Sequence, residues 1–446
     1  MHRLRSLVMA LRGSLWFVPA ITVAGAIVLG VAVSEADLAA GAWAAQRWPR
    51  FFAATPDGAR AVLGAIASAM ITVTGIVFSM TLVTLSLAAS HYGSRVLRQF
   101  MRDRANQLVL GTFLGVFAYC LVVVRAVRGG DDPFVPAFAV AIAIAFAFVA
   151  IGVLIYYLHH VATSVQAPHI IATLAHETLQ AAAAMASRDT GERGPAQPPQ
   201  PAAARWHPVA ARRSGFVATV GTSSLHDLAC ALGTTIRMDA GAGDFVADGT
   251  SLASVADVVP DDETAAAIDG CYAIGVERSI DEDVGYGMRQ IVDIALRALS
   301  PGVNDPTTAV LCLHWLTVVL RRLVAVRFPP AACYDAEGRL RLIARQPSFD
   351  ALLHTAYDQV ADAAAGDAVV LGHLEASLAA VAAACEDPAR QAAIAQLAAS
   401  LHARVSRDVG DPDARRRLQR GLRRLAGGER RDASAPLRPP GEIDAA

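Results

Sequence analysis

The densest polar chemistry of this sequence lies between residues 275 and 310. The polar group within this stretch, 277–305, opens with four acids, Glu277, Asp281, Glu282 and Asp283. Clustered carboxylates can hold a divalent cation, because Ca²⁺ and Mg²⁺ prefer oxygen ligands. Acids that directly precede a helix also stabilise the positive end of its dipole without any ligand. Both interpretations fit this spacing, and we assign no metal ligand from it.

A helix predicted over about 284–299 has to position the middle of this group. Arg289, Asp293 and Arg297 follow one another at intervals of four residues. Side chains at that interval share one face of a helix, so the three form a ladder of alternating charge. Such a ladder either stabilises an exposed helix face or belongs to a polar site, and the sequence does not decide between the two.

The last residues of the group, about 300–305, are predicted to form a short connection between two helices. The SPG sequence should close the first helix, with Gly302 in the left-handed conformation that glycine adopts readily. Asn304 or Asp305 should cap the second helix, and Pro306 suits its first position. That second helix, about 307–326, has too short an apolar run to cross a bilayer, so we expect it in a soluble core.

A long stretch without charge, 61–89, is the second candidate for chemistry. It is longer than the roughly 20 residues that a membrane-crossing helix needs. Small residues at intervals of three, four or seven form one line along this helix. We call this line the small-residue stripe, and it consists of Ser68, Thr72, Gly75, Ser79 and Ser86. The stripe either packs against another helix or lines a water-filled path.

A loop rich in arginine follows this helix, with Arg95, Arg98, Arg102 and Arg104. Arginines in a short loop determine membrane topology and contact anionic headgroups. The same cluster could instead attract anions to the inner mouth of a pore.

Several function classes are excluded by composition. The 446 residues contain no lysine, so a Walker-type phosphate loop and a Schiff-base lysine are impossible. The formal net charge of −1 gives no basic field for nucleic acid. The six cysteines are scattered without a C-x-x-C pair, which is typical of reduced thiols in a cytosolic compartment. We therefore expect no cofactor, no catalytic residue and no nucleic-acid partner.

The chain is 54% hydrophobic, which indicates a membrane protein. Four spans are predicted, at about 14–34, 61–89, 108–127 and 134–158. Their arginine-rich flanks place the N-terminus and the large C-terminal part in the cytoplasm of a bacterial inner membrane. No Asp, Glu, Lys or His lies deep inside these spans, so we expect passive conduction rather than coupled pumping.

The predicted fold is a membrane α-helical bundle of four transmembrane helices, followed by a cytosolic α+β domain that ends in an all-α segment. Alternating apolar runs, Gly/Asp turns and a Pro-rich stretch set the boundaries. The predicted parts of the chain are a transmembrane domain at 1–160, a helix with a Pro-rich linker at 161–208, an α+β domain at 209–330, a helical segment at 331–428 and a disordered tail at 429–446.

Three phrases of the sequence resemble a known family. They are TGIVFSMTLVTLSLAAS at 74–90, the FMRDR of the arginine-rich loop, and IVDIALRALSPGVNDPTTA at 291–309. The chain resembles the bacterial predicted-membrane-protein family known as domain of unknown function 2254, from the first span to about Leu323. The resemblance implies a multi-spanning inner-membrane protein with a cytosolic domain, and it carries no activity or site residue.

Two functions remain open. The first is a homo-oligomeric, channel-like or passive transport protein gated by its cytosolic domain, with an unknown small ligand or ion. The second is a membrane-anchored sensor or scaffold whose spans only tether it to the lipid bilayer. No catalytic motif indicates an enzyme.

Overall fold

A computed structural model describes residues 16–47, 55–92, 103–130, 133–164, 166–187 and 205–428. At 39–47 and 88–92 it describes the helical backbone only. The chain divides into two compact units, 1–166 and 167–446. Residues 188–204 of the predicted Pro-rich linker, residues 429–446 of the predicted tail, and Arg95, Arg98 and Arg102 lie outside the described residues. The predicted linker ends too late, because a β-strand already begins at Trp206.

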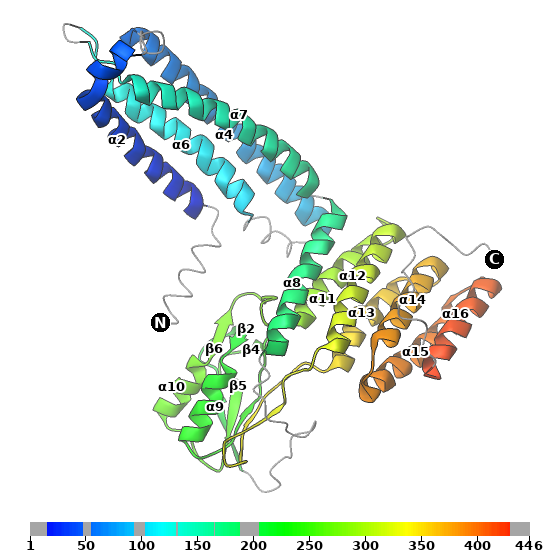
Figure 1. The fold of residues 1–446 in the computed structure, drawn as a ribbon. Coiled ribbons are helices and arrows are strands. Elements are labelled where there is room, and N and C mark those ends of the chain that lie inside the picture. Colours follow the sequence, from blue (N-terminus) through cyan, green and yellow to red (C-terminus); the bar gives the residue numbers. More distant parts are fainter. Residues whose placement is uncertain are drawn as a thin grey trace. The chain divides into compact units, whose positions relative to one another are not determined.

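The first unit consists of α2 (Phe17–Arg47), α4 (Pro56–Tyr92), α6 (Arg104–Ala126) and α7 (Ala137–Ser164). These helices contain the four hydrophobic stretches of the sequence, and α6 packs against each of the other three (Figure 1). Small residues permit a close approach of α2 and α6, because a Cβ on Gly111 would come within 2.9 Å of Thr22 Oγ1. Close helix contact through small residues is the usual packing mode inside membranes.

The second unit begins with α8 (Ala167–Ser187) and continues as an α+β part with two sheets. The larger sheet has the strand order β1-β5-β3-β8-β7 and the smaller one β4-β2-β6. All pairings are antiparallel except β3 with β8. The strands are β1 (Trp206–Ala210), β2 (Gly215–Val220), β3 (Ile236–Met238), β4 (Phe245–Val246), β5 (Ser251–Ala256), β6 (Tyr272–Gly275), β7 (Ala332–Tyr334) and β8 (Leu340–Ile343).

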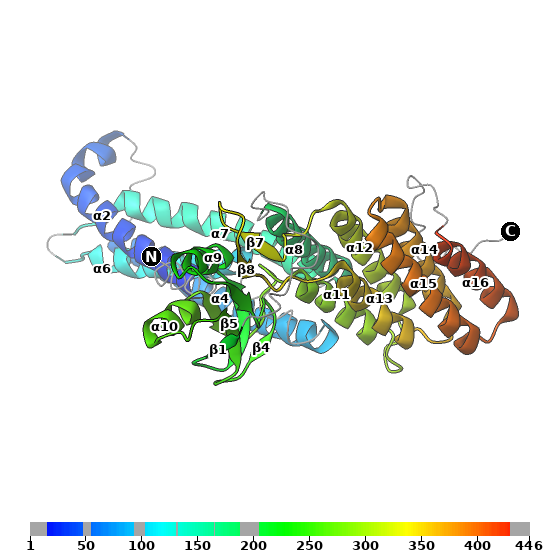
Figure 2. The same cartoon turned by 90° about the horizontal axis from the view of Figure 1, so that it is seen from below.

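Two short helices, α9 (Thr222–Ala231) and α10 (Asp262–Gly270), pack on these strands. The remaining helices form a separate layer beside the sheets, as Figure 2 shows from below. They are α11 (Val284–Ala298), α12 (Pro306–Ala325), α13 (Phe349–Ala363), α14 (Ala368–Ala384), α15 (Pro388–Asp408) and α16 (Pro412–Ala426).

Five helices in the described residues are long and apolar enough to cross a membrane, namely α2, α4, α6, α7 and α12. The fifth is the helix that the sequence analysis assigned to a soluble core. In the structure α12 packs against α8, α11 and α14 within the second unit. Its residues Leu313, Leu316 and Leu320 are fully buried there.

Candidate functional site

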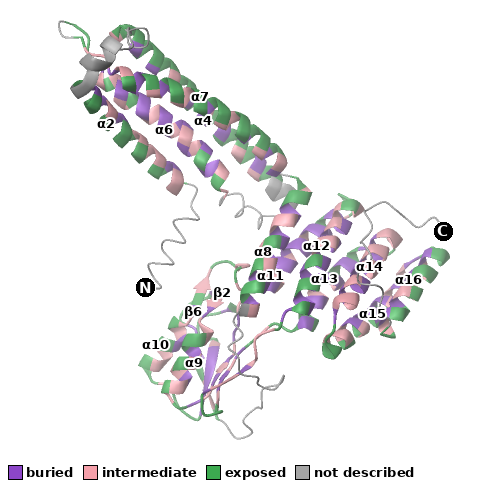
Figure 3. Cartoon of the chain, viewed as in Figure 1, coloured by how far each residue is buried: buried purple, intermediate pink, exposed green. Residues whose placement is uncertain are grey.

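The small-residue stripe lies on the side of α4 that no other helix of the first unit covers. All five of its residues, Ser68, Thr72, Gly75, Ser79 and Ser86, are exposed. The opposite side of α4 is buried against the bundle. Figure 3 colours each described residue by its burial. A Cβ placed on Gly75 would have no neighbour within 4 Å. Within the described residues of one copy of the chain, the stripe is therefore left uncovered.

The hydroxyls on the two sides of α4 differ in how they are satisfied. On the packed side, the hydroxyls of Thr81 and Tyr157 are 2.7 Å apart, and Tyr157 also donates to the Val77 carbonyl at 3.0 Å. On the exposed side, Thr72 donates to the Ser68 carbonyl at 2.8 Å. That is the one side-chain hydrogen bond that the stripe makes in the described part of the chain.

Only Arg104 of the predicted arginine cluster is described, and it is the first residue of α6. Asp103 caps this helix by accepting from the Ala105 amide at 2.9 Å. The other oxygen of Asp103 lies 2.6 Å from His160 Nε2 on α7. This link joins the start of α6 to the last turns of α7, and the sequence could not reveal it because the two residues are far apart in the chain.

The structure places a buried acid near the end of the first candidate span. Helix α2 continues past the predicted end of the first span, and its apolar segment Phe17–Leu38 includes Asp37. The Asp37 side chain is buried and accepts hydrogen bonds from the amides of Ala139 at 3.0 Å and Phe138 at 3.4 Å. These amides begin α7, where the positive end of the helix dipole stabilises a carboxylate.

The first acids of the 277–305 group have separate local roles. Asp283 caps α11 by accepting from the Tyr286 amide at 2.9 Å, and it pairs with Arg278 Nη2 at 2.5 Å. Asp281 is exposed and accepts from the Ser279 hydroxyl at 2.6 Å within the same turn. Glu277 is exposed. The capping interpretation is therefore confirmed for Asp283.

The middle of the group contains an ion pair on α11. Arg289 Nε donates to Asp293 at 2.8 Å, with both side chains partly exposed. Arg297 lies in the last turn of the helix and is exposed. A positive charge in the last turn interacts favourably with the negative end of the helix dipole, and this interaction is consistent with a structural role for Arg297.

The junction after α11 differs from the prediction in one respect. Gly302 does not take the left-handed conformation; Asn304 does, with φ of 48°. Asparagine tolerates this region because its short polar side chain can hydrogen-bond locally. Asp305 caps α12 as predicted, accepting from the Thr308 amide at 3.1 Å, with Pro306 at the first position.

The 277–305 group does not form one site. Helix α11 separates its two ends by about 22 Å at 1.5 Å per residue. No group of three or more His, Cys, Asp or Glu side chains in the described ranges is placed to hold a metal ion. The concentration of charge in the sequence thus reflects consecutive helix ends rather than convergent ligands.

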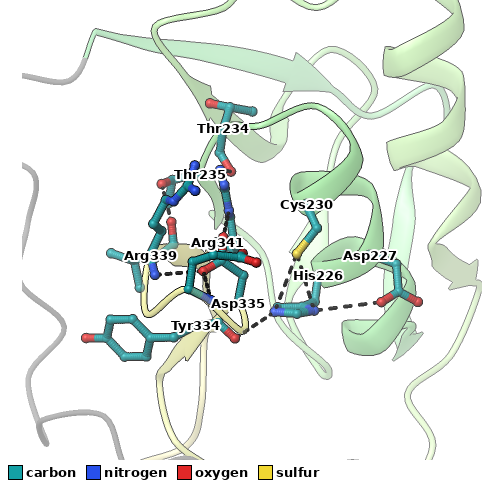
Figure 4. A network of polar contacts seen from close by, with 11 residues as sticks. His226, Asp227, Cys230, Thr234, Thr235, Tyr334, Asp335, Arg339 and Arg341 are labelled. Atoms are coloured by element: carbon teal, nitrogen blue, oxygen red, sulfur yellow. Dashed lines mark hydrogen bonds and ion pairs between the residues drawn. The ribbon is translucent and has the colours of Figure 1, made fainter.

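A polar network that the sequence analysis did not identify joins the β7–β8 hairpin to α9 (Figure 4). Asp335 accepts from Arg341 Nε at 2.7 Å, and both side chains are buried. Burial acts to raise the pKa of Asp335, but hydrogen bonds from the hairpin backbone and from Arg341 outweigh it and lower that pKa. His226 lies 3.1 Å from the Tyr334 carbonyl.

Cys230 also belongs to this network. Its Sγ lies 3.9 Å from Nδ1 and 3.8 Å from Nε2 of His226, so the sulfur contacts the imidazole ring on the same helix. Because His226 in turn lies against the Tyr334 carbonyl, the network holds the hairpin against α9.

Comparisons with known proteins agree with the resemblance stated above. Residues 12–380 match the family described as "Predicted membrane protein (DUF2254)". An uncharacterized protein of Mycobacterium tuberculosis strain H37Rv is 33% identical over 423 residues, covering 93% of this chain and 80% of that protein. An uncharacterized protein of Mycobacterium bovis matches with the same identity and coverage. No solved structure matches. The chain therefore belongs to the DUF2254 family of predicted membrane proteins.

Proposed function

We propose that copies of this chain assemble in the bacterial inner membrane into a channel-like protein for passive transport. The small-residue stripe of α4 faces the shared path or the neighbouring copies. The four helices of the first unit cross the bilayer, and the second unit lies in the cytoplasm, where it gates the path.

The exposure of the stripe is the observation that carries this proposal. Ser68, Ser79 and Ser86 lie on the uncovered side of a helix in an apolar bundle. Hydrocarbon offers their hydroxyls no hydrogen-bond partner, and leaving a hydroxyl without one costs on the order of 1–3 kcal/mol. A second copy of the chain or a column of water would supply those partners.

Asp37 is compatible with passive transport. Its carboxylate is occupied by the first amides of α7 and does not point into an open cavity. Coupled transporters use intramembrane acids that load and release a cation, whereas this acid acts as a helix cap.

A membrane-anchored sensor or scaffold is the second candidate, and the Thr72 hydroxyl favours it. Because this hydroxyl already bonds to the Ser68 carbonyl at 2.8 Å, part of the stripe is satisfied without water. In that case the stripe is only a packing surface between copies, as small residues often are in membranes.

The test has two parts, oligomeric state and ion flux. Native mass spectrometry in detergent should give a homo-oligomer, and the purified protein in liposomes should pass ions. Ser79→Leu should abolish the flux and keep the oligomer, because the leucine fills the path. Ala69→Leu is the matched control, since Ala69 is exposed on the same helix about 100° away from Ser68.

Each outcome separates the candidates. A monomer would overturn the channel proposal, because one stripe cannot enclose a path. An oligomer that passes no ions under voltage, tension or osmotic shock would favour the scaffold. Equal loss of flux in Ala69→Leu would mean that the stripe has no special role.

A further inference from the structure

We propose that the exposed arginine face of α16 binds anionic phospholipid headgroups at the membrane surface. This face consists of Arg416, Arg417, Arg420, Arg423 and Arg424, all of which are exposed. The proposal does not depend on ion conduction, and it concerns a part of the chain beyond the residues that match the family.

The other side of α16 is already occupied within the second unit. Leu418, Leu422 and Leu425 are buried, and the helix packs against α14 and α15. A Cβ on Gly421 would overlap the Glu375 side chain of α14, so the two helices are in close contact there. The helix therefore cannot insert an apolar face into lipid. Only its charged side is available to a partner.

Three arginines of this face differ from the paired arginines nearby. On α15, Arg404 pairs with Asp358 and Asp362, and Arg407 pairs with Asp408. On α16, the acid Asp413 pairs with Arg416 in the first turn. Within the described part of the chain, Arg417, Arg420 and Arg423 make no ion pair.

The positive charge of α16 is local. The whole chain has 39 basic and 40 acidic residues, so there is no general excess of positive charge. Between Pro412 and Ala426, six arginines stand against one aspartate. A concentrated positive face attracts a dense array of negative groups, and each arginine near an anionic bilayer contributes about 1 kcal/mol of attraction.

A lipid surface fits this face better than a nucleic acid does. Proteins that bind single strands interleave basic residues with aromatic rings on which bases stack. The sequence of α16, PDARRRLQRGLRRLA, contains no aromatic residue. The chain also belongs to a family of predicted membrane proteins, so a bilayer is part of its surroundings.

The experiment measures binding in trans with the full-length protein. The protein is placed in nanodiscs of neutral phosphatidylcholine and mixed with vesicles that contain about 30% phosphatidylglycerol, a negatively charged surface of the kind that attracts basic segments. Co-flotation gives the apparent affinity. Wild-type discs should float with these vesicles, and neither empty discs nor neutral vesicles should show binding. Binding should weaken steeply as salt rises, because the Debye length falls to about 3 Å at 1 M salt.

The decisive variant replaces three arginines by glutamine, R417Q/R420Q/R423Q. Since each arginine is worth about fivefold in affinity, binding should fall by on the order of 100-fold. The matched control is R321Q/R322Q/R327Q, which removes the same charge from exposed positions at the end of α12. Both variants should keep the wild-type unfolding temperature, which shows that each still folds.

Undiminished binding by R417Q/R420Q/R423Q would overturn the proposal, and so would an equal loss in the control. A fluorescent RNA oligonucleotide provides the last comparison. If RNA binds more tightly than the vesicles and displaces them, the face serves nucleic acid and the lipid proposal is wrong.

Discussion

Replacing Asp283 by alanine should destabilise the second unit strongly, whereas the same change at Asp281 should not. Loss of the helix cap on the Tyr286 amide costs about 1 kcal/mol. Loss of the charge-assisted bond to Arg278 costs a further ~2 kcal/mol, toward the lower end of its range because that arginine is 32% exposed. The sum of about 3 kcal/mol corresponds to a fall of roughly 6–12 °C in unfolding temperature for a unit of this size.

The surroundings of Asp283 leave little room for compensation. Its side chain is only 10% exposed. Gly243 lies against it, with φ of 89°, and a Cβ at that position would overlap the carboxylate. Asp281, by contrast, is an exposed residue two positions away whose removal should cost less than about 0.5 kcal/mol.

Thermal unfolding of the full-length protein in detergent measures this difference, with and without millimolar Ca²⁺ or Mg²⁺. If Asp283 only caps the helix, Asp283→Ala should lower the unfolding temperature both with and without the metal ion, and Asp281→Ala should leave it unchanged. If the acids instead hold a cation, the metal should raise the unfolding temperature of the wild type, and either substitution should abolish that increase. Metal-dependent stabilisation, or equal losses at the two positions, would refute the capping explanation.

Two further predictions concern buried polar groups. Asp37→Leu should lower the stability of the first unit by about 2 kcal/mol, because two amides of α7 lose their acceptor, and Asp37→Asn should cost less since its oxygen still accepts. Unfolding temperatures in detergent measure this, and equal losses would mean that the charge matters rather than the hydrogen bonds. Burial lowers the pKa of His373 on α14. Between that pKa and the unfolded value of about 6.5, the unfolded chain binds more protons, so the stability of the second unit should fall as pH drops below about 6.5. His373→Gln should flatten this dependence in melts from pH 5 to 7, and an unchanged slope would contradict the assignment.

The local features of the chain could be predicted from sequence because they depend on neighbouring residues. The Asp305 cap with Pro306 follows from residue types at adjacent positions. The turn of the β7–β8 hairpin is equally local, since Gly338 has a φ of 74° and glycine adopts that region readily. The error at Gly302 has the same local nature, since both glycine and asparagine tolerate the left-handed region and the sequence offers both.

Features that join distant segments could not be predicted. Strand β8 pairs in parallel with β3, which brings Leu342 beside Ile236. In the sequence these two residues are separated by α11 and α12. No periodicity within either strand specifies that partner. The Asp37 cap on α7 could not be predicted for the same reason. Asp37 accepts from the Ala139 amide because α2 packs beside α7, and its neighbours in the sequence do not indicate this.

The two sides of α4 show why the sequence alone left the stripe ambiguous. Hydroxyls occur on both sides of this helix, so a count of polar residues does not separate them. On the packed side, the chain satisfies its own groups, as when Thr74 donates to the Met70 carbonyl at 2.7 Å. On the other side, Ser79 and its neighbours in the stripe are exposed. In hydrocarbon that exposure is unfavourable, whereas against a second copy or water it is not. Which hydroxyls of α4 are exposed therefore follows from the packing of the bundle, and the spacing of the residues did not reveal it.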